Sequence, residues 1–241
     1  MTVHSGIADL ADAERGMGLG RGMDRKASLL RVSPMDIANY IQALNKEIRR
    51  CNRCRLAKSR KNAVCGEGDL SAKIFFVAQA PGENEDREGR MFIGPSGMVL
   101  NEMLRRIEMD RKDIYMTNLI KCLLPKNRKP NSDEIETCGQ FLVREIEAVR
   151  PRILVPLGYY ATRYIFNKYG IAYPSKAEFH RVYGSIFMVG DREIIPVQHP
   201  AALLHNAAVR EDMIRNYGIL RDRARNVEEK SAGLDGETLP L

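Results

Sequence analysis

The chain has 241 residues, 44% of them apolar, and a formal net charge of +7. This length suffices for the core of one globular domain, and no apolar run approaches the ~20 residues of a transmembrane helix, which excludes a membrane-spanning protein. The N-terminus intersperses charges where a secretory signal carries an apolar run, so we expect a cytoplasmic protein with no membrane partner.

Three stretches of the chain differ in composition. Residues 1–34 combine a glycine-rich run with mixed charges and little periodicity, and we expect a disordered extension there. Residues 35–226 have the periodic pattern of a folded domain, beginning with a helix whose apolar face leads into Cys51 and Cys54. Residues 227–241 are acidic and contain glycine, and we expect a frayed tail.

Apolar segments with the length of buried strands alternate with helical segments. The predicted strands are residues 73–80, 113–120, 152–157 and 193–197. The predicted helices that follow them are residues 96–109, 133–149, 159–168 and 208–224. This alternation predicts an α/β fold, a three-layer α/β/α sandwich with a central four-stranded parallel sheet.

Polar or irregular residues stand at the ends of three of these strands: Gln79 to Gly82, Asn118 and His199. Ligand sites of parallel sheets lie at the carboxyl ends of the strands. The topology therefore gathers these three segments into one crevice.

The segment from Ala78 to Gly94 is rich in glycine and acidic residues. Glycine and proline fix tight turns whose backbone N–H groups are free to meet a ligand carbonyl or a phosphate. Glu85 and Asp86 have the chemistry to activate water, and Phe92 to stack on a base. Taken by itself, the segment is also typical of an ordinary strand-to-helix loop.

Four of the five cysteines have the spacing of a metal site: Cys51-x-x-Cys54, Cys122 and Cys138. In a reducing compartment such thiols bind metal in preference to forming disulfides. Four thiolates suit zinc or an iron–sulfur cluster, and the spacing does not separate the two. The alternative is that Cys122 and Cys138 are buried core thiols, as we expect for Cys65.

Two basic clusters flank these cysteines. The first is Lys46, Arg49, Arg50, Arg53, Arg55, Lys58, Arg60 and Lys61, and the second is Lys121, Lys126, Arg128 and Lys129. Either cluster alone indicates a solvated face. Beside the cysteines, both indicate a basic surface next to a metal site, suited to a polyanion.

Seven motifs, in order and with fitting gaps over residues 48–222, resemble those of the type 4 uracil-DNA glycosylases. They read Cys51-x-x-Cys54, AQAPGENED (78–86), GRMFIG (89–94), YMTNLIKC (115–122), NRKP (127–130), Cys138 and HPAALL (199–204). The resemblance implies a uracil-DNA glycosylase-like fold and a DNA-repair enzyme, and we expect a monomer. Such an enzyme flips uracil out of single- or double-stranded DNA and hydrolyses its N-glycosidic bond. It also implies that the four cysteines ligate a 4Fe–4S cluster in place of zinc.

The resemblance assigns roles to residues of the crevice. Phe92 stacks on the flipped uracil, and Asn118 pairs with the N3–H and O4 edge, which discriminates against cytosine. His199 donates a hydrogen bond to uracil O2 as negative charge builds on the departing base. The backbone of Gln79 and Ala80 lines the other side of the base.

Gln79 departs from the family pattern, which usually has Glu at this position. Water activation by a side chain then falls to Glu85, the first acid of the Glu-Asp pair. On the DNA side, the resemblance implies contacts from Arg128 and from Leu203 or Leu204, one of which wedges into the base stack. A core role is the alternative for either leucine.

Three rival functions remain at this point. Gln79 motivates a DNA-binding paralogue with weak or altered base-excision activity. Altered base specificity, towards hypoxanthine or xanthine, is a second. A zinc-stabilised α/β module without enzymatic function is the third.

Overall fold

The computed structural model describes residues 33–234. Residues 1–32 of the predicted disordered extension lie outside the described residues. Helix α2 (Pro34–Arg50) begins directly after them, and Ser33 caps it by accepting a hydrogen bond from the Asp36 backbone N–H at 3.2 Å. No helix of residues 33–234 has both the length and the apolar character needed to cross a membrane.

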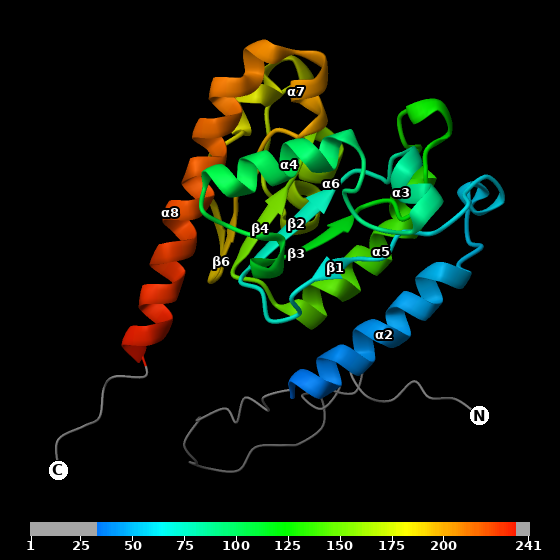
Figure 1. Cartoon of the computed structure of the whole chain (residues 1–241), viewed down its shortest axis with the longest axis horizontal. Coiled ribbons are helices and arrows are strands. Elements are labelled where there is room, and N and C mark those ends of the chain that lie inside the picture. The colour runs from blue at the N-terminus through cyan, green and yellow to red at the C-terminus, as the bar shows by residue number, and fades with distance from the viewer. Residues whose placement is uncertain (1–32, 235–241) are drawn as a thin grey trace, which may run out of the picture. The chain divides into compact units, whose positions relative to one another are not determined.

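A six-stranded sheet with the order β1-β3-β2-β4-β6-β5 forms the centre of the domain (Figure 1). Its strands are β1 (Glu67–Gly68), β2 (Ile74–Ala78), β3 (Ile114–Asn118), β4 (Ile153–Pro156), β5 (Phe187–Val189) and β6 (Arg192–Ile194). The four inner strands are mutually parallel, which confirms the predicted α/β fold and its four-stranded parallel centre.

Two antiparallel edge strands were not predicted from the sequence. The first, β1, has only two residues and pairs with β3, and β5 forms a hairpin with β6 across Gly190 at φ +59°. Both strands are too short to produce a recognisable alternation of apolar and polar residues. The prediction of a sheet with four strands was therefore incomplete at both edges.

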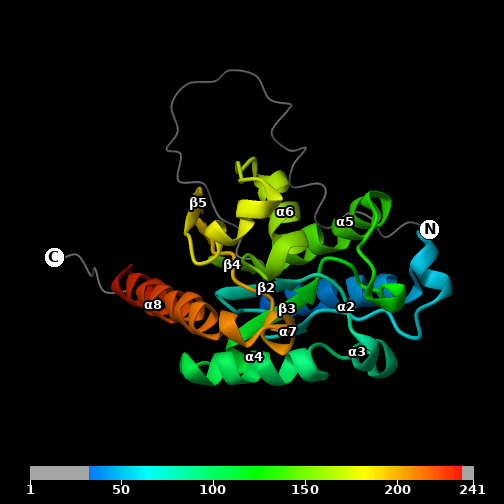
Figure 2. The same cartoon turned by 90° about the horizontal axis from the view of Figure 1, so that it is seen from above.

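Both faces of the sheet are covered by helices. The remaining helices are α3 (Glu83–Glu88), α4 (Pro95–Arg106), α5 (Ser132–Val149), α6 (Gly158–Tyr169), α7 (Ala201–His205) and α8 (Arg210–Leu234). On β2, Phe75 and Val77 pack with α2, α5 and α6, whereas Ile74 and Phe76 pack with α4 and α8. Figure 2 shows α4 and α8 on one side of the strands and α5 and α6 on the other. The strands are buried on both faces, which explains why they read as continuous apolar runs.

The last helix extends further than predicted. We expected it to end at residue 224 and an acidic tail to begin at residue 227, but α8 continues to Leu234. The stretch after residue 224 contains good helix formers and no proline, so nothing in it stops the helix. The short helices α3 and α7 were not predicted either.

Candidate active site

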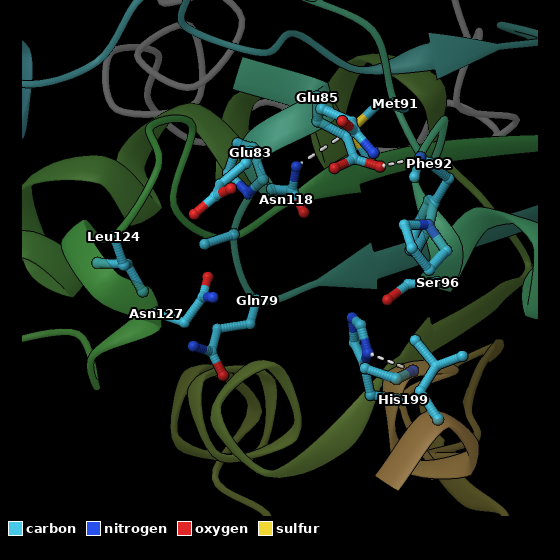
Figure 3. Close-up of a pocket in the computed structure, with 18 of the residues that line it drawn as sticks. Gln79, Glu83, Glu85, Met91, Phe92, Ser96, Asn118, Leu124, Asn127 and His199 are labelled. Carbon is cyan, nitrogen blue, oxygen red and sulfur yellow. Dashed lines mark hydrogen bonds between the residues drawn. The ribbon is translucent and has the colours of Figure 1, made fainter. Parts of the chain in front are cut away.

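A cavity of about 640 Å³ opens at the carboxyl edge of the sheet, where the chain leaves β2, β3 and β6. The three segments that the topology was expected to gather line it together. Of the residues singled out from the sequence, its walls contain Gln79, Ala80, Glu85, Phe92, Asn118, His199 and Leu204. Figure 3 shows Phe92 and His199 on one side, Gln79 on the opposite side and Asn118 between them.

Asn118 is the last residue of β3 and is 2% exposed. Its Nδ2 donates a hydrogen bond to Met91 Sδ at 3.1 Å. This contact orients the amide and leaves its oxygen free for a donor in the cavity. Met91 is therefore a site residue that the sequence did not reveal.

His199 follows β6 and is half-buried in the cavity wall. The Ala201 backbone N–H donates to its Nδ1 at 3.1 Å, so the neutral ring carries its proton on Nε2. Burial lowers the pKa of His199 to about 4, against an opposing effect of the Glu85 carboxylate. The imidazole is thus neutral at physiological pH, and its free nitrogen points into the cavity (Figure 3).

Phe92 lies in a backbone conformation that is unusual for its residue type. Its φ is +50°, in the left-handed region, which costs a non-glycine residue about 1–3 kcal/mol. The first turn of α4 packs against it so closely that a Cβ on Gly97 would lie 1.8 Å from the Phe92 carbonyl oxygen. The Phe92 ring centroid is 6.1 Å from that of His199, so the two rings border the same space.

The two adjacent acids of α3 have different surroundings. Glu85 is 8% exposed and lines the cavity, with one carboxylate oxygen accepting the Gly94 N–H at 2.7 Å. Asp86 does not line the cavity and instead accepts the backbone N–H groups of Lys61 and Asn62 at 3.0 and 3.3 Å. Of the two acids considered for water activation, only Glu85 faces the site.

On the far side, the Gln79 carbonyl accepts the Ile120 N–H at 2.9 Å, which ties the exits of β2 and β3 together. Asn127 and Leu124 line the cavity beside Gln79 (Figure 3). Neither was given a role from the sequence, although Asn127 begins the NRKP motif. Ser96, Glu83 and His205 also line the cavity.

The residues expected to contact DNA fall into different environments. Leu204 is 47% exposed and lines the cavity, whereas Leu203 is half-buried and packs against the core between the sheet and α4. Arg128 does not line the cavity. It donates to both oxygens of buried Glu134, at 2.6 and 2.9 Å.

The four cysteines with metal-site spacing line a second, small pocket, together with Ile48, Ala57, Arg60, Lys121, Thr137 and Phe141. Arg60 donates to Cys122 Sγ and the Lys121 backbone N–H donates to Cys138 Sγ, both at 3.2 Å. Burial raises the pKa of the Cys122 thiol, and that of Cys138 to about 12. Thiols this reluctant to ionise become thiolates when a metal takes the place of the proton.

The basic clusters near these cysteines differ from each other. Members of the first are exposed, except half-buried Arg60. In the second, Lys121 is 1% exposed and its Nζ lies 2.6 Å from both Glu145 Oε2 and Thr117 Oγ1. The prediction of a basic surface was therefore wrong for Lys121, whose charge is neutralised inside the domain.

Comparisons with known proteins identify the family of the chain. The sequence model of the uracil DNA glycosylase superfamily matches residues 65–217. The type-4 uracil-DNA glycosylase of Saccharolobus solfataricus is 40% identical over 190 residues, covering 76% of this chain and 82% of that protein. The type-4 enzyme of Archaeoglobus fulgidus is 41% identical and that of Thermotoga maritima is 39% identical. Each match covers 69% of this chain and 84% of the relative. The chain therefore belongs to the uracil-DNA glycosylase superfamily and, within it, to the type-4 uracil-DNA glycosylases.

Proposed function

We propose that this protein excises uracil from DNA, hydrolysing the N-glycosidic bond and leaving an abasic site. The observation that carries this proposal is the single cavity that contains a carboxamide, an imidazole and an aromatic ring at the carboxyl edge of the sheet. A base cannot be reached inside the duplex, so the uracil must be flipped into that cavity.

Asn118 and Phe92 recognise the flipped base. With its Nδ2 oriented towards Met91, Asn118 offers Oδ1 to uracil N3–H, whereas cytosine presents an unprotonated N3 that cannot donate. Phe92 supplies a flat apolar surface for the face of the ring. The backbone of Gln79 and Ala80 borders the opposite side of the base.

His199 and Glu85 carry the chemistry. As the C1′–N1 bond breaks, its electron pair leaves with uracil and negative charge builds on O2, where His199 Nε2–H donates a hydrogen bond. A water oxygen forms the new bond to C1′, and its proton passes to the Glu85 carboxylate. Because uracil leaves as a comparatively stable anion, bond breaking runs ahead of water attack. Gln79 is then compatible with activity although it cannot act as a base.

Cys51, Cys54, Cys122 and Cys138 would hold a 4Fe–4S cluster. The four cysteines line one pocket, and four thiolates are a ligand set that either zinc or a 4Fe–4S cluster takes. Membership of the type-4 glycosylases favours the cluster. When bound, the cluster would contribute to structure, because these cysteines would cross-link the end of α2, the exit of β3 and helix α5.

The partner is uracil-containing DNA, single- or double-stranded, and the exposed basic cluster between Lys46 and Lys61 supplies charge for its backbone. We also propose that the protein is a monomer. A cytoplasmic location is in keeping with thiols that must stay reduced to bind iron.

The direct test is release of uracil by the purified protein from an oligonucleotide with a single U:G pair, with a T:G duplex as the negative substrate. We expect release from U:G and from a single-stranded uracil oligonucleotide, and much slower release by Asn118→Ala and His199→Ala. No release of uracil by the wild-type protein would overturn the proposal. Tight binding of the uracil oligonucleotide without release would instead indicate a DNA-binding paralogue.

Leu204 is the leucine suited to fill the gap that the flipped base leaves in the duplex, because it is exposed at the cavity. Leu204→Ala should slow release from duplex DNA by about tenfold, while release from single-stranded DNA changes by less than about twofold. Leu203→Ala is the matched control: it removes a packed side chain and should lower Tm by a few degrees while sparing the duplex-to-single-strand ratio. An equal loss on both substrates with Leu204→Ala would refute the wedge role.

A further inference from the structure

The turn that carries Met91 and Phe92 provides two groups of the uracil site at once. Met91 Sδ accepts the hydrogen bond that orients Asn118, and the Phe92 ring borders the cavity opposite Gln79. The turn is not self-supporting, because Phe92 has a left-handed φ of +50° that a phenylalanine adopts only when its surroundings enforce it. Other residues must therefore stabilise this conformation.

Arg111 makes the contacts that such stabilisation needs. Its guanidinium donates to the carbonyl oxygens of two successive residues, Met91 at 3.1 Å and Phe92, and also to that of Gly97 at 3.4 Å. Its Nε donates to Asn101 Oδ1 at 2.7 Å, which fixes the plane of the group. Arg111 itself lies at the start of the segment that leads into β3, whose last residue is Asn118.

The other side of the turn is held separately. Glu67 accepts the Met91 backbone N–H at 3.1 Å. Arg111 therefore binds the carbonyl oxygens of the turn, including that of the strained residue Phe92. Only a planar group with several donors in a fixed arrangement can reach these acceptors together, whereas a lysine ammonium is a single point of charge on a flexible stem.

We propose that Arg111 is a positioning residue for uracil: it keeps the Met91–Phe92 turn in the conformation that aims the Phe92 ring at the base and orients Asn118 through Met91. It does not touch the substrate. The inference rests on the proposed function, since it concerns how the same cavity accepts uracil.

The test is a double-mutant cycle between Arg111 and Phe92, with two readouts: kcat and KM on a single-stranded uracil oligonucleotide, and inhibition by free uracil. Arg111→Met should lower kcat/KM by about tenfold to a hundredfold and weaken inhibition by free uracil in parallel. Arg111→Lys should recover little of this loss. In a Phe92→Ala background, Arg111→Met should lower kcat/KM by a smaller factor than in the wild-type background, because the ring it positions is already absent and only the effect on Asn118 through Met91 remains.

Arg106→Met serves as the matched control, since Arg106 is an exposed arginine of α4 whose side chain pairs with Glu102. It should leave both readouts within about twofold of wild type. Thermal melting identifies any variant that fails to fold, and if Arg111→Met does not fold, Arg111→Lys completes the cycle in its place. Unchanged inhibition by free uracil, or additive effects of the Arg111 and Phe92 substitutions, would overturn the inference while the wild-type protein still releases uracil. Failure of the wild type to release uracil would instead refute the proposed function.

Discussion

Replacing His199 with alanine is expected to slow uracil release by about two to three orders of magnitude, the usual cost of losing one donor to a developing oxyanion. The Ala201 N–H fixes the tautomer by donating to Nδ1, so the proton on Nε2 is available for uracil O2. The substitution leaves the negative charge of the departing base without this partner. Most of the loss should appear in kcat, because the charge develops only in the transition state. Single-turnover kinetics on a U:G duplex measures it.

His180→Ala is the matched control for this substitution. His180 is an exposed histidine outside the cavity, and its removal should change the rate by less than about twofold. A His199→Ala protein that releases uracil at nearly the wild-type rate would refute the donor role. So would a loss confined to KM, which would indicate a contact made equally to the ground state.

The pH dependence distinguishes a neutral donor from an imidazolium. Burial lowers the pKa of His199 to about 4, so the ring is already neutral at pH 5 and does not titrate between pH 5 and 8. An imidazolium acid would instead lose activity as the pH rises through 6 to 7.

The effect of His199 on the free energy of unfolding has the opposite sign to that of a salt-bridged histidine. The unfolded chain binds a proton at His199 below about pH 6.5, whereas the folded chain binds it only below about pH 4. His199 therefore makes the folded state less stable as the pH falls through this window, and His199→Ala should reduce that acid sensitivity in thermal melts.

The parts of the site that were predictable are those that depend on topology. Continuous apolar runs revealed the four parallel strands, and parallel strands necessarily bring their carboxyl ends to one edge. That rule alone gathered Gln79, Asn118 and His199 before any side chain was located. Edge strands of two and three residues have no such signal.

Contacts between distant side chains were not predictable in this way. Nothing in the sequence shows that Arg111 reaches the Phe92 carbonyl, or that Lys121 is buried against Glu145 rather than exposed with its basic neighbours. Glu85 and Asp86 are adjacent acids of one short helix, and the sequence does not show which of them faces the cavity. The structure places Glu85 in the cavity wall, whereas Asp86 lies outside it and binds the Lys61 N–H.

Loss of one cysteine of the proposed cluster site is expected to have a large effect on iron content and stability, because the four cysteines come from segments far apart in the chain. Cys51 and Cys54 follow α2, Cys122 follows β3, and Cys138 lies in α5 and is 7% exposed. A cluster bound there would therefore join three elements of the fold. Cys138→Ala should remove one ligand of the four, reduce iron from about four per chain to almost none, abolish the brown colour and lower Tm.

Cys65→Ala is the matched control for the loss of a buried thiol. Cys65 is 5% exposed, and its Sγ donates weakly to the Asn45 carbonyl oxygen at 3.6 Å, outside the pocket that the other four cysteines line. Its replacement creates a comparable small vacancy in the same core, so both variants should lose some packing energy, but Cys65→Ala should retain its iron and its visible absorption. Iron analysis and absorption spectra of protein purified without oxygen separate the two effects. Equal iron in the Cys138→Ala and wild-type proteins, or a colourless wild type with about one zinc per chain, would refute cluster ligation by these cysteines.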